Sequence, residues 1–441
     1  MLGSNLKIIR ELKAFLSLIT QDPELLSVFC TVPNGFTRKR KLHFDRLVLL
    51  IAKLCKKTLD VEIEGFFEDM QIPCRCSVSA FSQQRVKLSP MFYSVWNKLL
   101  SASFYYYYGD KVKRWKGYRL IAGDGSNVSL VSTPALESHF GGQSNQQGSF
   151  VQGKAFYLYD VLNQLILDAN LQPYRVGELS MAYPMINGCL QEDMLMIYDR
   201  NFCNYKMVAL HQFHEKEIKF VIRANEHRNI VKVFLRSGAK SSIIYLSPTP
   251  SAIAGLAKCG YKIEKTSLLK VRLVRVELEN SVEVLMTNLY EEEGYHCDEF
   301  KDLYFKRWGI ETNISFQKNI LRLEAFSGLS PVTVMQDFYA TAFISNLFST
   351  LTTEAQQILD NQIEVTKYPL KINGNKSYAR LRANLIPLFI NSEPETILKI
   401  LNMHFIRAPL PVRKNRRFQR KVKNKQSKRK HKMFMNYKPA F

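Results

Sequence analysis

The feature that most constrains this chain is an alternation of strand-like and helix-like segments between residues 118 and 223. The strand-like runs, rich in β-branched, aromatic and other apolar residues, cover 119–130, 155–161, 165–171, 194–198 and 219–223. The first of them is interrupted by the polar segment 123–126, and a helical pattern over 205–216 precedes the last. Strands followed by helices in this order predict a mixed α/β sheet covered by helices.

Helical patterns flank this alternating segment on both sides. We expect helices over residues 7–19, 44–57, 61–70 and 79–100 before it, and over 298–322, 331–359 and 378–390 after it. Between them, residues 271–278 alternate apolar and charged side chains and residues 282–289 return after a turn, which predicts two half-exposed strands. With 441 residues, the chain is too long for one ordinary domain.

We therefore expect a helical N-terminal domain, an α/β core in two parts, a β-rich insertion, a C-terminal helical region and a basic tail. Their boundaries are, in that order, residues 1–114, 115–223 with 281–350, 224–280, 351–410 and 411–441. The helix that starts near Ser79 has a polar and basic face that would suit a DNA groove, and a solvated surface helix is an equal alternative.

The charge balance predicts a polyanionic partner. The chain has 62 Lys and Arg against 39 Asp and Glu, a formal charge of +23, which favours nucleic acid over an anionic membrane. The last 46 residues contain no Asp or Glu, and ten Lys or Arg fall between residues 416 and 432. We interpret this tail as an arm that contacts the DNA backbone, with Arg416, Arg417 and Lys421 among its contacts; a solubilising tail is the alternative.

Membrane and disulfide-bonded classes fit poorly. The most apolar stretch, residues 47–52, ends at Lys53 and is far shorter than the roughly 20 residues that span a bilayer. The N-terminal segment has the pattern of an amphipathic helix and not of a signal peptide. The eight cysteines form no paired metal-binding motif, so we interpret them as reduced thiols of a cytoplasmic protein.

Two aspartates lie within apolar strand-like runs. Asp124 interrupts the first run, and Asp199 follows directly on residues 194–198. Burying a carboxylate there is unfavourable unless it is paired or binds a cation. A turn position for Asp124 and a helix N-cap for Asp199 are the simpler alternatives.

A second set of chemically active side chains lies on the expected helix 298–322. Tyr304, Arg307, Glu311 and Lys318 are separated by 3, 4 and 7 residues, which places them on one stripe of a helix roughly 60° wide. An Arg–Glu pair at this spacing also stabilises ordinary helices, by a few tenths of a kcal/mol. Combined with the two aspartates, Glu311 would complete a cage of hard oxygen ligands for two Mg²⁺ ions, with Mn²⁺ as a substitute.

Three motifs together resemble the catalytic blocks of the insertion-sequence-four family of bacterial DDE transposases. They are Asp124-Gly125-Ser126, the Tyr-Asp-Arg-Asn-Phe segment at 198–202, and Tyr-x2-Arg-x3-Glu-x6-Lys at 304–318, which has all four signature residues at the family spacing. The similarity covers roughly residues 115–350. It implies a ribonuclease-H-like sheet interrupted by a β-stranded insertion.

The resemblance also implies a role for each residue of the three motifs. Asp124, Asp199 and Glu311 would be the catalytic metal ligands, and Tyr304, Arg307 and Lys318 would hold a DNA phosphate. Arg200 would also contact DNA, or else form a salt bridge with a neighbouring carboxylate. The implied partners are double-stranded DNA, as terminal inverted repeats and as target, and a second copy of the chain in a homodimeric synapse.

The leading hypothesis is thus a cut-and-paste transposase that acts on the ends of its own element. One alternative is a DNA-binding protein of the same fold that has lost catalysis, which the intact set of three carboxylates disfavours. Another is a metal-dependent nuclease without a strand-transfer step. Other polar candidates have simpler interpretations: Asp160 as the end of a hairpin, Glu178 as the start of a helix, and His211 as a surface or core histidine.

Overall fold

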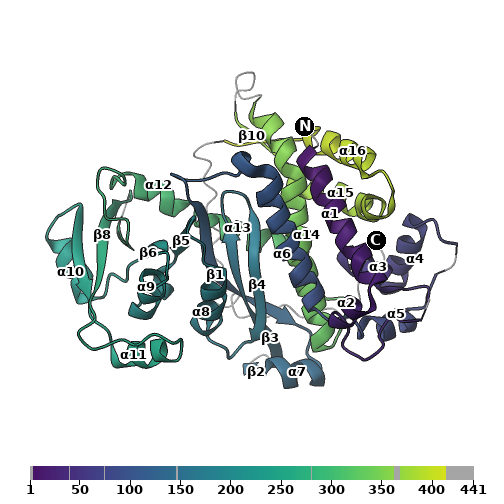
Figure 1. Ribbon diagram of the computed structural model, residues 1–441, viewed down its shortest axis with the longest axis horizontal. Helices are drawn as coiled ribbons and strands as arrows, with labels where there is room; N and C mark the ends of the chain where they lie inside the picture. Colours follow the sequence, from purple (N-terminus) through teal and green to yellow (C-terminus); the bar gives the residue numbers. More distant parts are fainter. Residues whose placement is uncertain are drawn as a thin grey trace.

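A computed structural model describes residues 3–38, 40–73, 75–145, 148–279, 281–361 and 368–413. Figure 1 shows a central sheet with helices packed against it. The helices from both ends of the chain gather on one side of the molecule, and the segment around α10 and α11 lies on the opposite side. The fold is therefore α/β with a mixed sheet flanked by helices, as predicted.

Nine strands form the main sheet. They are β1 (Arg119–Leu130), β2 (Gly142–Asn145), β3 (Gly148–Asp160), β4 (Leu165–Pro173), β5 (Met194–Tyr198), β6 (Lys219–Arg223), β7 (Ser241–Leu246), β8 (Leu269–Glu277) and β9 (Val282–Thr287). Their order is β2-β3-β1-β5-β6-β9-β8-β7, and β4 pairs with β3 outside this path. In the part of the chain that the structure describes, a short second sheet joins β10 (Leu370–Lys371) to β11 (Leu410–Pro411).

The central strands have the ribonuclease-H-like arrangement that the resemblance implied. β4, β3 and β1 are antiparallel neighbours, whereas β1, β5 and β6 run parallel. Parallel strands are covered on both faces by their crossover helices, so they need apolar residues throughout. β5 has five consecutive buried residues, which meets this requirement.

The predicted interruption of the first strand is wrong. β1 continues for 12 residues through 123–126, because β3 pairs with it on one side along 121–130 and β5 on the other along 119–122. β3 thus supplies the backbone hydrogen bonds that hold the polar, glycine-containing segment 123–126 extended, and β5 fixes the residues just before it. Asp124 is accordingly a strand residue and not a turn residue.

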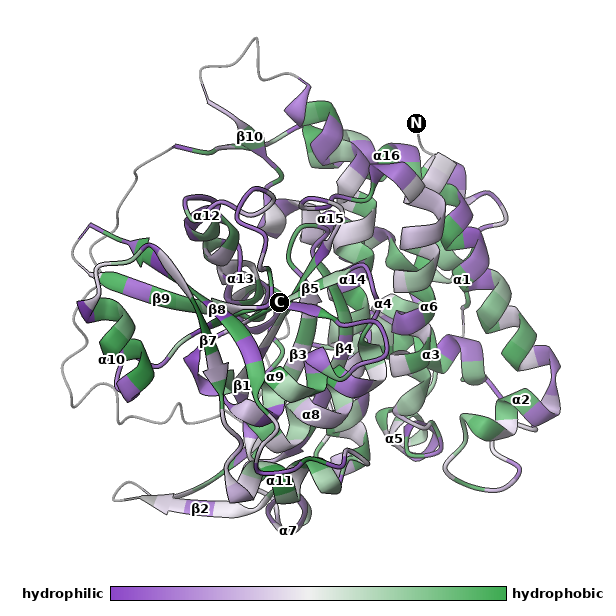
Figure 2. Cartoon of the chain, turned by 60° about the vertical axis from the view of Figure 1, so that its left-hand side comes forward, coloured by the Kyte–Doolittle hydropathy of each residue, from purple (hydrophilic) through white to green (hydrophobic). Residues whose placement is uncertain are grey.

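Residues 224–280 extend the same sheet. β7 and β8 from this insertion join it through β9, which pairs with β6. The insertion also contains two helices, α10 (Asn229–Arg236) and α11 (Pro250–Ala257), that its β-rich sequence pattern did not predict. Figure 2 shows hydrophilic residues within the largely hydrophobic strands β8 and β9.

β8 is more buried than its alternating pattern predicted. Arg272 is only 1% exposed, because α12 (Glu299–Phe305) covers this part of the strand and the guanidinium lies over the ring of Phe300. Its Nη1 donates to the carbonyl oxygen of Tyr295 at 2.9 Å. The charged residue is therefore part of the packing and not of a solvated face.

Several predicted helices begin or end elsewhere. The pattern at 79–100 is two helices, α5 (Val78–Arg85) and α6 (Met91–Tyr108), separated at Pro90, and Ser77 caps α5. The helix expected at 44–57 is shorter in the structure, where α3 spans Phe44–Ala52. The remaining helices include α1 (Gly3–Gln21), α2 (Pro23–Val28), α4 (Leu59–Asp69), α7 (Pro134–Phe140), α8 (Glu178–Cys189), α9 (Tyr205–Gln212), α13 (Trp308–Asn319), α14 (Pro331–Asp360), α15 (Gly374–Ile390) and α16 (Pro394–Ile406).

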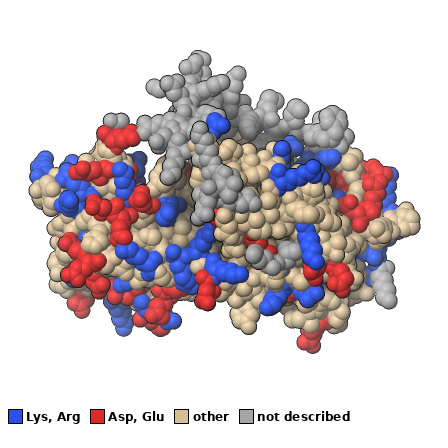
Figure 3. Space-filling model, turned by 90° about the horizontal axis from the view of Figure 1, so that it is seen from above, with Lys and Arg blue, Asp and Glu red and all other residues tan. Residues whose placement is uncertain are grey.

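The surface charge of the described residues is mixed. Figure 3 shows Lys and Arg side chains interspersed with Asp and Glu over much of one face. Residues 414–441, which lie outside the described part, contribute twelve Lys and Arg and no acidic residue to the formal charge of +23. About half of the basic excess is thus concentrated in the tail.

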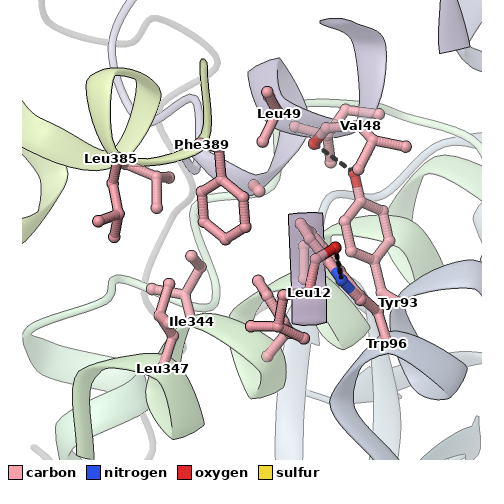
Figure 4. Close-up of a cluster of buried hydrophobic side chains, with 14 of the residues drawn as sticks. Leu12, Val48, Leu49, Tyr93, Trp96, Ile344, Leu347, Leu385 and Phe389 are labelled. Atoms are coloured by element: carbon pink, nitrogen blue, oxygen red, sulfur yellow. Dashed lines mark hydrogen bonds between the residues drawn. The ribbon is translucent and has the colours of Figure 1, made fainter. Parts of the chain in front are cut away.

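One hydrophobic core joins the helices from the two ends of the chain. Trp96 on α6 stacks on Phe343 of α14, with ring centroids 4.1 Å apart. Its ring also lies 5.3 Å from that of Phe389 on α15, and Figure 4 labels both Trp96 and Phe389. The indole Nε1 donates to the carbonyl oxygen of Leu12 on α1. α14 also packs against β4, so it connects this core to the sheet that carries the candidate site.

Within the described residues, every helix is too short or too polar to cross a membrane. None of the seven described cysteines is joined in a disulfide to another described cysteine, and Cys74 lies outside the described residues.

Candidate active site

Two neighbouring parallel strands bring Asp124 and Asp199 together. Ala122 on β1 lies opposite Ile197 on β5. Asp124 comes two residues later on β1, and Asp199 comes two residues later in the chain, directly after β5, so the two lie at the same level of the sheet. Neighbouring strands are about 4.8 Å apart. The sheet therefore places two carboxylates from segments 75 residues apart next to each other.

Asp124 lies in a mostly buried position of β1. Its Oδ1 accepts a hydrogen bond from the backbone N–H of Gly125 at 2.8 Å. Burial raises the pKa of Asp124 to about 7, the hydrogen bond from Gly125 and the charge of Arg307 oppose this rise, and the charges of Glu178 and Asp199 add to it. Near pH 7 the protonated and ionised forms of Asp124 are therefore of similar stability, and a nearby cation would favour the ionised form.

Asp199 has the N-cap role that the sequence offered as the simpler alternative. It follows β5 directly, and its Oδ1 accepts from the backbone N–H of Asn201 at 2.8 Å, which caps the short 3₁₀ turn at Arg200–Phe202. Because only one carboxylate oxygen is used in this way, the cap leaves Oδ2 available to a further ligand.

Arg307 connects Glu311 to Asp124. Its Nη2 donates to Glu311 Oε1 at 2.8 Å, and its Nη1 lies 3.8 Å from Asp124 Oδ2. Arg307 is only 8% exposed, and its Nε has no hydrogen-bond partner among the described residues. A buried cation thus lies between two of the three predicted metal ligands, and the surroundings accommodate positive charge at this point.

The helix geometry around Arg307 differs from the prediction. The single helix expected at 298–322 consists of α12 and α13, joined by a tightened turn in which the N–H groups of residues 306, 307, 309 and 310 each donate to the carbonyl three residues earlier. Such 3₁₀ segments inside helices often mark functional positions. The turn lies between Tyr304 and Glu311, within the signature block.

Among the described residues, no three His, Cys, Asp or Glu side chains converge as a ready-made metal cluster. The Arg307 guanidinium lies where such a cluster would form, between Asp124 and Glu311. The donor set itself, three carboxylates, has the chemistry that hard divalent ions prefer. Metal binding by this set would therefore require Arg307 to move away.

The other residues predicted to contact DNA are Tyr304, Lys318 and three residues of the tail. Tyr304 is 8% exposed, and burial raises its pKa to about 12 while the charge of Arg307 lowers it. The Lys318 ammonium donates to the backbone oxygen of Asn127 and lies 3.5 Å from Glu324 Oε1, beside the far end of β1. Arg416, Arg417 and Lys421 lie outside the described residues.

Arg200 is exposed on the 3₁₀ turn that follows Asp199. Over the described parts of the chain, no salt bridge of Arg200 with a carboxylate occurs, so that alternative finds no support in the structure. The guanidinium is accessible to a ligand at the edge of the site.

The structure adds a fourth carboxylate, Glu178, to the site. It starts α8, as predicted, and its Oε2 accepts from the side-chain amide of Asn201 at 2.8 Å. A Cβ atom on Gly125 would lie 2.2 Å from Glu178 Oε1, so the absence of a side chain at Gly125 allows this close approach. The glycine directly after Asp124 is the sequence signal that could have indicated a close neighbour.

Two other polar candidates belong to the packing. Asp160 ends β3 in the predicted hairpin, is fully buried, and accepts hydrogen bonds from Tyr105 and Asn163. His211 is also fully buried and lies 3.1 Å from the hydroxyl of Tyr198, and burial lowers its pKa to about 4. These contacts support structural interpretations of Asp160 and His211.

The strand order defines a class of protein, those with a ribonuclease-H-like fold, and Asp124 and Asp199 lie on or directly after its neighbouring parallel strands β1 and β5. The family follows from the sequence comparison. A family model described as "Transposase DDE domain" matches residues 115–347, more than half of the chain, and the chain therefore belongs to this family. It is a DNA-cleaving and DNA-transferring enzyme of DNA transposition, and enzymes of this family generally depend on divalent metal ions.

Two further comparisons were made. A comparison with curated protein sequences found no match. Among solved structures, the chain is similar to a cryo-EM structure of a piggyBac transposase synaptic complex with hairpin DNA, at 9% sequence identity and a TM-score of 0.36, over 90% of this chain and 77% of that chain.

Proposed function

We propose that the chain is a transposase of the insertion-sequence-four family that cuts and joins DNA at the ends of its own element. Asp124, Asp199 and Glu311 would be its catalytic residues and would hold two Mg²⁺ ions, with Mn²⁺ as a substitute. The observation that carries this proposal is the position of Arg307, a buried cation between Asp124 and Glu311, beside the neighbouring Asp199.

The bound ions would activate the attacking hydroxyl and stabilise the leaving 3′-oxygen in an in-line displacement at phosphorus. The residues of the chain would supply position and charge. Asp199 is oriented by its bond from Asn201 N–H, and Asp124 by its bond from Gly125 N–H. The second oxygen of Asp199 would then be available to a ligand, and that of Asp124 would become available once Arg307 moves away.

Arg307, once released from Glu311, would offer its planar fork to a phosphate of the bound DNA, and Tyr304 would add a single donor beside it. Lys318 lies farther along β1, at Asn127, and would contact a different phosphate. Arg200 and the basic tail with Arg416, Arg417 and Lys421 would contact the backbone elsewhere, a contribution that weakens as salt rises.

The proposed DNA partners are the terminal inverted repeats of the element and a target duplex. We also propose that two copies of the chain pair the two ends in a homodimeric synapse, in the cytoplasm of a bacterium and at its nucleoid. The domain boundaries predicted from the sequence would assign binding to residues 1–114 and 411–441 and chemistry to 115–223 with 281–350.

The test is strand cleavage of DNA that carries the gene's own flanking sequences, with and without Mg²⁺. Asp124→Asn, Asp199→Asn and Glu311→Gln should each lower the cleavage rate by about 100-fold or more, since loss of an outer-sphere partner alone can reach that size. Binding to the same DNA should change little. Asp302→Asn, an exposed position on α12, is the matched control and should cleave normally.

Full cleavage by all three variants would contradict the proposed active site. Cleavage by the unaltered protein without any joined product would instead favour the metal-dependent nuclease, and Mg²⁺-independent binding without cleavage would favour a silent DNA-binding protein.

A further inference from the structure

A groove runs between α8, α9 and the insertion helix α11, which Figure 1 shows side by side. It consists of two hollows with volumes of about 720 and 530 Å³. Both are lined by Tyr183, Lys206 and Gly255, so they are continuous with each other. One wall belongs to the ribonuclease-H-like core and the other to the insertion.

All the charged residues that line the groove are basic. Lys206 and Arg228 line the larger hollow and Lys206 and Lys258 the smaller one, and no Asp or Glu lines either. Across the described residues, none of these three cations forms a salt bridge with a carboxylate. Cations that the fold leaves without an acidic partner favour a polyanionic ligand.

The lining also offers aromatic and polar groups. The Lys206 ammonium lies 4.1 Å from the ring centroid of Tyr183, whose hydroxyl donates to the side-chain oxygen of Asn204 at 3.2 Å. Ser247, Thr249 and Ser251 add hydroxyls on the insertion side. Basic side chains interleaved with an aromatic ring are the features with which proteins bind single-stranded nucleic acid.

The groove adjoins the candidate active site. Leu179 in its lining directly follows Glu178, and Asn204 comes five residues after Asp199. Arg228 is anchored to this region, because its Nη2 donates to the carbonyl oxygen of Cys203 at 2.7 Å. The start of α8 and the segment after Asp199 thus contribute residues to both the candidate active site and the groove.

We propose that this groove holds a single DNA strand that leads away from the carboxylates, with Lys206, Arg228 and Lys258 on its phosphates and the Tyr183 ring against an unpaired base. The inference rests on the proposed function and adds a strand-binding surface to it. An unpaired strand fits better than a duplex, because only an unpaired base exposes the face that a tyrosine ring inside a groove can contact.

The test compares two triple variants of the full chain with equal charge changes. Lys206→Ala/Arg228→Ala/Lys258→Ala removes the groove cations. Lys232→Ala/Arg236→Ala/Lys262→Ala removes three exposed cations of the insertion outside the groove. Binding of a labelled single strand is measured across a salt series without divalent ions, so that no cleavage is required. A duplex of the same sequence is measured in parallel.

The groove variant should lower the slope of log affinity against log salt for the single strand by about 2, since each phosphate contact contributes about 0.7. The control variant should keep the slope, and duplex binding should change much less. The proposal would be overturned if the groove and control variants had the same salt slope for the single strand. It would also be overturned if the groove variant lost as much of its salt slope with the duplex as with the single strand.

A second measurement locates the strand directly. A photo-crosslinking residue at Ser251, in the groove lining, should crosslink to the single strand, and the same residue at exposed Ser237 outside the groove should not. Equal crosslinking at both positions would overturn the proposal. Asp124→Asn should retain both the slope and the crosslink, so a failure of the proposed catalysis is distinguishable from a failure of this groove.

Discussion

At the scale of single residues, Arg307 links two of the three candidate carboxylates, Asp124 and Glu311. Its guanidinium pairs with Glu311 and faces Asp124, and it is nearly buried. The mutual repulsion of carboxylates in a partly buried place is unfavourable, and a cation among them reduces it. The same guanidinium is the group that the sequence motif assigned to DNA phosphate.

Local sequence patterns, an apolar run or one helix stripe, were enough to select Asp124, Asp199 and Glu311 as candidates. They did not indicate Glu178, whose contact with Gly125 joins a helix start to a strand 53 residues away. Nor did they indicate that Lys318 pairs with Glu324 beside Asn127. Such neighbours are set by packing between elements, which no local pattern contains.

His211 gives a pH-dependent prediction. Its pKa is about 4 in the folded protein and 6.5 ordinarily, so the folded state holds the neutral form. The contribution of neutral His211 to the stability of the folded state is fully present above pH 6.5 and is lost as the pH falls through 4. Between pH 7.5 and pH 5, this residue should account for a loss of about 2 kcal/mol of unfolding free energy.

His211→Gln, which keeps an amide near the Tyr198 hydroxyl, should remove that part of the loss. Chemical denaturation of both proteins at the two pH values measures it. An identical loss in the variant would show that His211 does not titrate as a buried histidine. His227 is exposed, and His227→Gln serves as the control.

At the scale of elements, the sequence indicated the type of most helices and strands but not their ends. α14 and β5 begin where expected, because Ser330 caps the former and an unbroken apolar run forms the latter. The helix at 298–322 was expected to be continuous, since its residues have no proline and a steady apolar stripe. Its tightened turn at residues 306–310 depends on hydrogen-bond geometry that composition does not determine.

The helix α5 was a candidate for DNA recognition, and one of its basic residues is unavailable for that role. Arg85 is 2% exposed; its Nε donates to Gln336 Oε1 at 2.7 Å and its Nη2 to Asp337 Oδ1 at 2.6 Å, both on α14. Its burial corrects the predicted basic face. Ser79, Ser82 and Gln83 remain exposed on the helix.

Removing one member of this buried pair should be strongly destabilising. Asp337→Ala would leave the Arg85 guanidinium without its carboxylate, a change that typically lowers stability by about 3–5 kcal/mol. Asp110→Ala, at an exposed position, should change stability little. Thermal and chemical unfolding of the two variants compare them. A small effect of Asp337→Ala would mean that α5 is held by its other contacts.

At the scale of the whole molecule, the structure joins parts that the sequence separates. Helices from residues 3–108 and 331–406 share one hydrophobic core, so the N-terminal and C-terminal helical regions pack as one body. Local patterns predicted both regions but could not predict their association, because contacts such as Trp96 with Phe343 join residues about 250 positions apart. The predicted domain boundaries remain predictions.

The central claim is that Asp124 on β1, Asp199 directly after β5 and Glu311 on α13 together bind divalent metal ions. Its most direct test is anomalous scattering from crystals of the full chain soaked in Mn²⁺. Our account predicts Mn²⁺ bound by these three carboxylates, with the Arg307 guanidinium displaced from Glu311. The account would be contradicted if Mn²⁺ were absent from these carboxylates or bound elsewhere while Arg307 remained paired with Glu311.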